Sequence, residues 1–260
     1  MSRVFVHCIY TAACYRLKKH VAIDKVFEFP FSEERLDQFR KSVIGMNKTN
    51  IPLSFHMKMM DSNKISDLKK KDLFFKEFDF KESIDEFYTD VLLDAEISSV
   101  DVGKYILAKK DYSLLPLQKM VYFCHAEYLF QTGRPLFTDT VFAFDKGPVE
   151  ESLWEKYHHQ GTGLLKEKTF GDDVDRAELI MKGRLRNARD GLKKLEVIDR
   201  TFEALKHKST RELVELTHSS GSPWARAYQK GAYRKEISDE AIQKFHEAER
   251  PRELSADRVQ

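Results

Sequence analysis

The sequence predicts a mostly α-helical protein: a compact helical domain with a small β element, preceded by an N-terminal extension that is α+β or irregular. Glycine and proline are scarce, at 11 and 7 of 260 residues, which disfavours an all-β sandwich. Apolar residues recur at helical spacing along most of the chain after residue 97. A hydrophobic content of 42% with 12% aromatic residues is enough for a buried core and too high for a disordered chain.

The overall charge, the apolar runs and the cysteines indicate the general class of the protein. Lys and Arg number 44 and Asp and Glu 42, so the net charge of +2 gives no indication of a nucleic-acid partner. No run of about 18 apolar residues indicates a transmembrane helix. The apolar segment from Val4 to Cys14 reads as a buried strand or helix rather than a cleaved signal. Three cysteines at unrelated spacings favour a reducing cytoplasm.

The composition and the helical periodicity of the sequence change near residue 97. Residues 1–97 are rich in Lys and Phe and weakly periodic, and we interpret them as an extension of unknown role. Within it we expect a short helix over Glu33–Ser42, capped by Ser32, and a helical stripe through Ile84, Phe87, Tyr88 and Val91. Residues 98–249 form the predicted helical domain, and residues 250–260 a polar tail.

Within residues 98–249, helix signals follow one another closely. Ser99 and Ser113 are the expected caps of two helices, the second ending at Gly133. Residues 137–145 favour a strand or hairpin arm, and Gly147-Pro148 is expected to stop it before a helix that starts at Val149. A basic helical segment over 175–190 and an apolar stripe over 192–205 come next. Further expected caps are Ser209, in a capping box with Glu212, and Ser238 for the last helix.

Candidate catalytic and metal sites are weak. Cys124-His125 and His158-His159 lack the partner spacing of a zinc site, and Cys124 lies on an apolar stripe. His218-Ser219 could suggest a Ser/His hydrolase, but no nucleophile elbow accompanies it, and a histidine at a helix end also has a structural use. Gly161-Thr162-Gly163 lacks the remaining features of a phosphate loop. We therefore expect no metal, no cofactor and no catalytic residue.

Two other features have a structural and a functional interpretation. The basic residues between 182 and 194 could contact nucleic acid or form a solvated helix face, and the second interpretation is favoured. Trp154 and Trp224 each follow a turn, where a large ring is either core or an exposed anchor for a partner.

Three sequence blocks resemble one family. The first comprises Tyr105–Ala108, Leu114–Phe123 and Gly133–Phe137, the second Phe142–Val149, and the third Leu216–Trp224. Their order and spacing over residues 98–249 are similar to the Panacea domain, found in SocA-type antitoxins and GepA-like phage-associated proteins. Phe144 departs from the family pattern, which usually has Trp there, and the turn from His218 to Trp224 looks slightly longer.

The resemblance implies a mostly helical, non-enzymatic antitoxin whose partner is a cognate protein toxin, and the cysteines favour the cytoplasm as its location. It leaves two alternatives open: an adaptor that delivers the toxin to an ATP-dependent protease, and a phage-associated regulator that binds nucleic acid. The motif residues that it transfers to this chain as partner-binding or scaffold positions are Lys119, Tyr122, Gly147, Pro148, Trp154, His218 and Trp224. It does not imply an oligomeric state.

Overall fold

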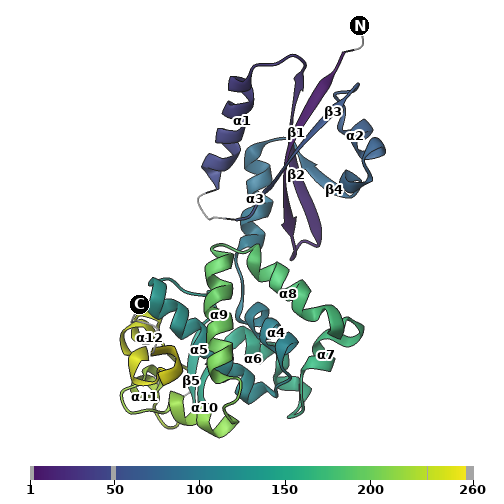
Figure 1. Ribbon diagram of the computed structural model, residues 1–260. Helices are drawn as coiled ribbons and strands as arrows, with labels where there is room; N and C mark the ends of the chain where they lie inside the picture. Colours follow the sequence, from purple (N-terminus) through teal and green to yellow (C-terminus); the bar gives the residue numbers. More distant parts are fainter. Residues whose placement is uncertain (1–2, 48–50, 233, 256–260) are drawn as a thin grey trace. The chain divides into compact units, whose positions relative to one another are not determined.

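The computed structural model describes residues 3–47, 51–232 and 234–255 (Figure 1). The chain divides into two compact units. Unit 1 comprises residues 1–96 with 187–190, and unit 2 comprises residues 97–186 with 191–260. Helices dominate, and the strands form a four-stranded and a three-stranded sheet. The expected mostly α fold class is confirmed, and among the described residues no helix has the length and apolar character needed to span a membrane.

Unit 1 is an α+β fold built on one sheet. Its elements are β1 (Phe5–Cys14), β2 (Lys19–Glu28), α1 (Glu33–Met46), β3 (Ser54–Met60), α2 (Ile65–Lys71), a 3-10 turn (Leu73–Phe75), β4 (Phe78–Lys81) and α3 (Ile84–Ala95). The strand order is β3-β1-β2-β4, in which β1 pairs antiparallel with β2 and β3, and β2 pairs parallel with β4. Of the two interpretations of the N-terminal region, α+β is therefore correct.

Alternate residues of β1 enter two separate cores, because successive side chains of a strand point to opposite faces. Cys8 and Tyr10 pack with Phe39 of α1 and Phe87 of α3. Ile9 joins a smaller core that includes Leu68 of α2. A strand covered on both faces reads as a continuous apolar run, which is why the sequence did not distinguish a strand from a helix here.

Unit 2 is the helical part. Its elements are α4 (Ser99–Lys109), α5 (Leu114–Thr132), β5 (Val141–Phe144), β6 (Gly147–Glu150), α6 (Glu151–Tyr157), α7 (Lys166–Phe170), α8 (Ala177–Arg186), α9 (Gly191–Leu205), α10 (Thr210–Thr217), α11 (Pro223–Ala227), β7 (Lys235–Glu236), α12 (Asp239–Phe245) and α13 (Arg252–Ser255). Three 3-10 turns (His158–Gln160, Gly171–Arg176 and His246–Ala248) lie between them.

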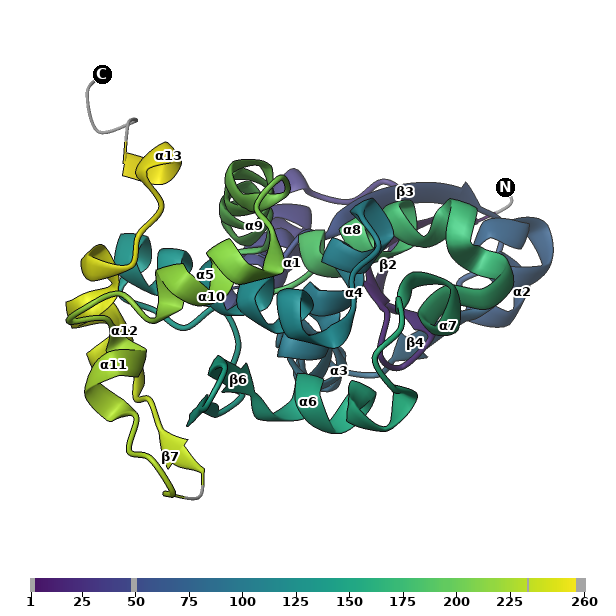
Figure 2. The same ribbon diagram turned by 90° about the horizontal axis from the view of Figure 1, so that it is seen from below.

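Helix α5 is the centre of unit 2. Its residues from Pro116 to Leu129 are all buried, and α4, α9, α10, α12 and β6 pack around it (Figure 2). A helix that is enclosed on every side must also bury its polar side chains. Gly133 ends α5 in the left-handed conformation, as expected from the sequence (φ 67°). The central position of α5 explains why this block of sequence carries charged residues into the core.

Several sequence-predicted boundaries need correction. Ser98 rather than Ser99 caps α4, in a capping box with Asp101. Gly147-Pro148 does not lead directly into a helix, because residues 147–150 form β6, paired with β5, and α6 begins at Glu151. Residues 252–255 of the expected polar tail form α13, in which Leu254 is buried, and residues 256–260 lie outside the described part of the chain. The capping box of Ser209 and Glu212 is confirmed.

Candidate functional site

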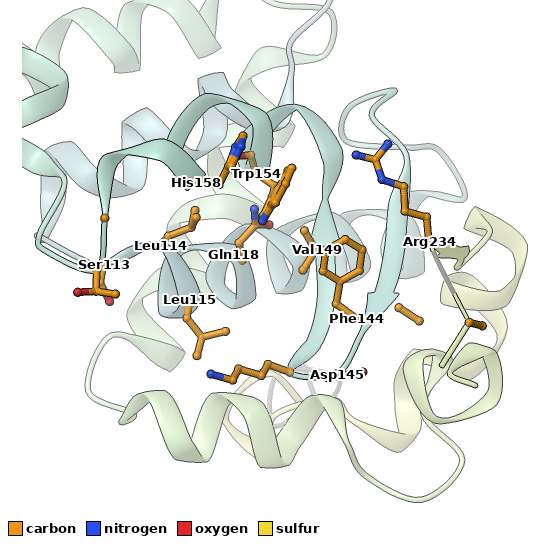
Figure 3. Close-up of a pocket in the computed structure, with 15 residues that line it drawn as sticks. Ser113, Leu114, Leu115, Gln118, Phe144, Asp145, Val149, Trp154, His158 and Arg234 are labelled. Carbon is orange, nitrogen blue, oxygen red and sulfur yellow. The ribbon is translucent and has the colours of Figure 1, made fainter. Parts of the chain in front are cut away.

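Unit 2 contains a pocket of about 760 Å³, which we call the Trp154 pocket (Figure 3). It lies between the first turns of α5, the β5–β6 hairpin, α6 and the segment before β7. Leu114 and Leu115 at the start of α5 form one apolar wall, and Val149 with Ala143 of the hairpin forms another. The pocket is therefore built from segments that are far apart in the sequence.

Aromatic rings line one end of the pocket. Trp154 is half-buried and stacks on His158, with 3.8 Å between ring centroids and 3° between planes. The Trp154 carbonyl oxygen also lies 2.9 Å from Nδ1 of His158, so the two residues fix each other one helical turn apart. Phe144 meets the same indole edge to face at 6.3 Å. The indole of Trp154 is thus partly exposed to the pocket, and its orientation is fixed by its contacts with His158 and Phe144.

Charged side chains surround the rim. Lys146 and Asp145 occupy the turn of the hairpin and are exposed, and Arg234 lies on the opposite side (Figure 3). The Arg234 guanidinium donates to Glu151 at 2.9 Å, and the Asp145 carboxylate accepts from the Tyr228 hydroxyl at 2.9 Å. Lys146 forms no ion pair with any carboxylate in the described residues.

The floor of the pocket is fixed by Gln118. This side chain is only 2% exposed, and its amide holds the backbone of Glu150: the Gln118 oxygen accepts from the Glu150 N–H at 2.9 Å, and its nitrogen donates to the Glu150 carbonyl at 3.4 Å. The Gln118 amide therefore makes the two backbone hydrogen bonds that a neighbouring strand would otherwise make to Glu150 at the end of β6. These bonds also connect the hairpin to α5.

Behind this floor lie two fully buried ionisable groups, Lys119 and Glu150. The Lys119 ammonium donates to the Pro148 carbonyl, whereas neither carboxylate oxygen of Glu150 has a hydrogen-bond partner among the described residues. Burial lowers the pKa of Lys119 to about 7, against the opposing charges of Glu150 and Glu249. Burial raises the pKa of Glu150 to about 8, and the charge of Lys119 only partly opposes this rise.

A second buried network ties the C-terminal segment to α5. The Tyr122 hydroxyl donates to Glu249 at 2.7 Å, and the imidazole of His246 lies between Glu249 at 3.1 Å and Glu127 at 3.3 Å. Arg250 donates two hydrogen bonds to Glu127, at 2.7 and 2.8 Å. Burial opposes ionisation of Glu127, but hydrogen bonds from His246 and Arg250 prevail and lower its pKa to about 2. The side chains of Tyr122, His246, Glu249, Glu127 and Arg250 in this network are at most 5% exposed.

Trp224 and His218 support the hairpin from the other side. Their rings stack with 3.6 Å between centroids and 5° between planes. The Trp224 indole N–H donates to the Phe144 carbonyl at 2.8 Å, and the ring is 8% exposed. Burial lowers the pKa of His218, and nearby Lys119 adds to this effect. Of the two interpretations of Trp224, the structure therefore places it in the core.

The residues transferred from the family pattern separate into two groups. Trp154 lines the pocket, while Lys119, Tyr122, Gly147, Pro148 and Trp224 are buried and His218 is half-buried. Sequence analysis did not identify Leu115, His158 and Arg234 as site residues, nor the buried partners Glu150 and Glu249. A short sequence pattern carries no signal for Arg234, which reaches the pocket only through pairing of β7 with β5.

The basic stretch, Cys124 and the histidines were the other candidate sites in the sequence. Arg184 and Lys194 of the basic stretch are buried, so residues 182–194 do not form one solvated basic face. Arg184 instead pairs with Asp101 at 3.3 Å. Cys124 is fully buried, and burial raises the pKa of its thiol. In residues 3–47, 51–232 and 234–255, no three His, Cys, Asp or Glu side chains are grouped as metal ligands.

Comparison with known proteins agrees with the resemblance predicted from sequence. Residues 117–225 match the family model described as antitoxin SocA-like, Panacea domain. Antitoxin SocA of Caulobacter vibrioides (strain NA1000 / CB15N) is 27% identical over 114 residues, which cover 43% of this chain and 57% of that protein. The match thus spans little more than half the length of this relative. No solved structure matches the chain. The predicted resemblance to the Panacea domain is confirmed over residues 117–225.

Proposed function

We propose that this protein is a non-enzymatic antitoxin that neutralises a cognate protein toxin by direct binding, with residues 98–249 as its Panacea-like domain. The match of residues 117–225 to the SocA-like antitoxin family carries the proposal. A toxin–antitoxin role is what that family suggests. Direct binding, the identity of the partner and action in the cytoplasm go beyond it.

The geometry of unit 2 is consistent with recognition rather than catalysis. Two ionisable groups with strongly shifted pKa values, Lys119 and Glu150, are 0% exposed. The Trp154 pocket offers apolar walls, a held indole and a charged rim. Partly exposed Trp and Arg side chains of this kind are frequent anchors in protein–protein interfaces.

The experiment is growth of cells that express the candidate toxin encoded beside this gene, with and without the full-length protein, followed by co-purification. Direct neutralisation predicts rescue of growth and a stable complex of the two proteins. Failure to rescue growth from a demonstrably toxic partner would contradict the proposal.

The same experiment separates the adaptor alternative. Delivery to an ATP-dependent protease predicts that the half-life of the toxin shortens when this protein is present, with rescue lost in cells that lack the protease. An unchanged half-life together with a co-purifying complex would exclude delivery and support direct binding. The nucleic-acid alternative is weakened by burial of Arg184 and Lys194, and salt-dependent binding to DNA would be its test.

A further inference from the structure

We propose that the Trp154 pocket is the docking site for the partner, and that it takes a polypeptide segment with a bulky apolar side chain next to a carboxylate. The inference rests on the proposed function in one respect, namely that the partner is a protein. The chemistry of the segment is argued from the lining of the pocket.

The apolar part of the pocket calls for a bulky side chain. The floor at Gln118 lies between two apolar walls, one formed by Leu114 and Leu115 and the other by Val149. The Trp154 indole closes one end of the pocket (Figure 3). At about 760 Å³ the pocket exceeds the volume of one side chain, so a short segment of chain enters rather than a single residue. Burying a Leu- or Phe-sized group here is favourable because it removes apolar surface of both partners from water.

The depth of the pocket offers little to a small polar ligand. Ligand sites usually contain a few convergent polar groups that fix the orientation of the molecule. The deep polar side chain in this lining is Gln118, and its amide is already engaged on both sides with the backbone of Glu150. A peptide, whose own backbone remains at the rim, does not require deep polar partners.

The positive groups at the rim favour a negatively charged group on the bound segment. Lys146 is exposed and forms no ion pair among the described residues. The neighbouring Asp145 keeps its negative charge, and its carboxylate accepts a hydrogen bond from the Tyr228 hydroxyl. Arg234 adds a second positive group on the other side, although it shares its charge with Glu151. Leu114 begins the 19-residue helix α5 at the same wall, and the start of a helix carries partial positive charge. A carboxylate beside the apolar anchor complements all three.

The experiment has a peptide arm that does not depend on a known toxin. A phage-displayed library of random dodecapeptides is selected on the immobilised full-length protein, and enriched peptides are synthesised and titrated by calorimetry. We expect enrichment of a bulky apolar residue next to Asp or Glu. Leu115→Glu, which places a charge in the apolar wall, and Lys146→Glu, which reverses the rim charge, should each weaken binding at least tenfold.

Two control variants carry the same kinds of substitution at positions away from the pocket. Leu192→Glu on α9 and Lys182→Glu on α8 alter exposed residues outside the lining and should leave binding unchanged within twofold. Thermal melting of all four variants confirms that they are folded. No enriched sequence, enrichment without acidic residues, or equal binding to folded Leu115→Glu would overturn the proposal.

The growth assay provides the second arm and distinguishes the two proposals. If the wild-type protein rescues growth and the folded pocket variants do so equally well, the docking site is wrong while the antitoxin function stands. If the wild-type protein does not rescue growth, the antitoxin function fails, and the peptide arm still decides what the pocket binds. Rescue by wild type and both controls, with loss in both pocket variants, supports the two together.

Discussion

Lys119 and Glu150 lie in the core of unit 2 with no exposed surface, which is unusual for side chains that carry charge in water. Taking both groups out of water costs several kcal/mol per ion, and mutual attraction offsets this cost only when the remaining hydrogen bonds are made. Lys119 has its bond to the Pro148 carbonyl, but the Glu150 carboxylate has no hydrogen-bond partner in the part of the chain that the structure describes. Glu150 is therefore the residue at which a small chemical change should be most informative.

Replacing Glu150 with Gln tests this directly. Because the folded pKa of Glu150 is raised to about 8, the folded state binds more protons than the unfolded state between pH 4.5 and 8, and wild-type stability falls as pH rises through this window. Glu150→Gln removes that proton uptake. We expect the free energy of unfolding of the variant, relative to wild type, to rise by up to about 1.4 kcal/mol per pH unit between pH 5 and 8.

Urea unfolding at pH 5, 6, 7 and 8 measures the difference. Glu253→Gln is the matched control, because this carboxylate is exposed and pairs with Lys208 at 2.8 Å on the surface. Its difference from wild type should stay within about 1 kcal/mol at every pH. A difference for Glu150→Gln that is flat across the range, or that falls with pH, would contradict the raised pKa.

Among the elements, the β5–β6 hairpin does most to connect the pocket to the core. Gly147 opens β6 with φ at 100°, where only glycine is unstrained. A Cβ at this position would lie 2.7 Å from Oγ1 of Thr217 and 2.9 Å from Cε of Lys119. The absence of a side chain thus lets the hairpin approach α5 and α10 closely enough for Pro148 to accept the hydrogen bond of Lys119.

Substituting Gly147 with Ala should therefore add a packing cost to backbone strain. We expect a loss of about 2–5 kcal/mol in the free energy of unfolding, from left-handed strain of about 1–2 kcal/mol and overpacking of about 1–3 kcal/mol. Gly161→Ala is the control, because Gly161 also has positive φ (76°) but a Cβ there meets no atom within 4 Å. It should lose only the strain. Equal losses in the two variants would show that the close approach contributes nothing.

The helices and caps were the elements that the sequence allowed us to predict, because they depend on neighbouring residues. Ser32, Ser113 and Ser238 begin helices where their positions indicated, and Gly133 ends one. Strand β6 was missed, since its pairing with β5 and the support from Gln118 depend on tertiary contacts. The sequence did not predict the pocket, and of its lining only Trp154 was named as a motif residue, because the walls come together from separate segments of unit 2.

For the whole molecule, each unit has its own core, and residues 187–190 are grouped with unit 1 although the rest of the segment belongs to unit 2. The Arg189 N–H donates to the Ala95 carbonyl at 2.9 Å, and its side chain pairs with Glu96 at 3.0 Å. The pocket, the Lys119–Glu150 pair and the network around Glu127 all lie within residues 97–260. We propose that residues 97–260 fold and neutralise the partner without residues 1–96.

The fragment 97–260 keeps the Ser98 capping box and buried Ile97, so α4 retains its start. It loses the Ala95 and Glu96 partners of Arg189, of which the exposed ion pair contributes about 1 kcal/mol or less. We expect a cooperative melt by circular dichroism and rescue of growth comparable to that of the full chain.

The fragment 110–260 is the counterpart, because it also removes α4 with its buried Val102, Tyr105 and Ile106, and it should not melt cooperatively. If 97–260 melts cooperatively but fails to rescue growth, residues 1–96 contribute to recognition of the partner. If it does not melt cooperatively, unit 2 depends on residues 1–96 for folding, and the domain boundary near residue 97 is not a folding boundary.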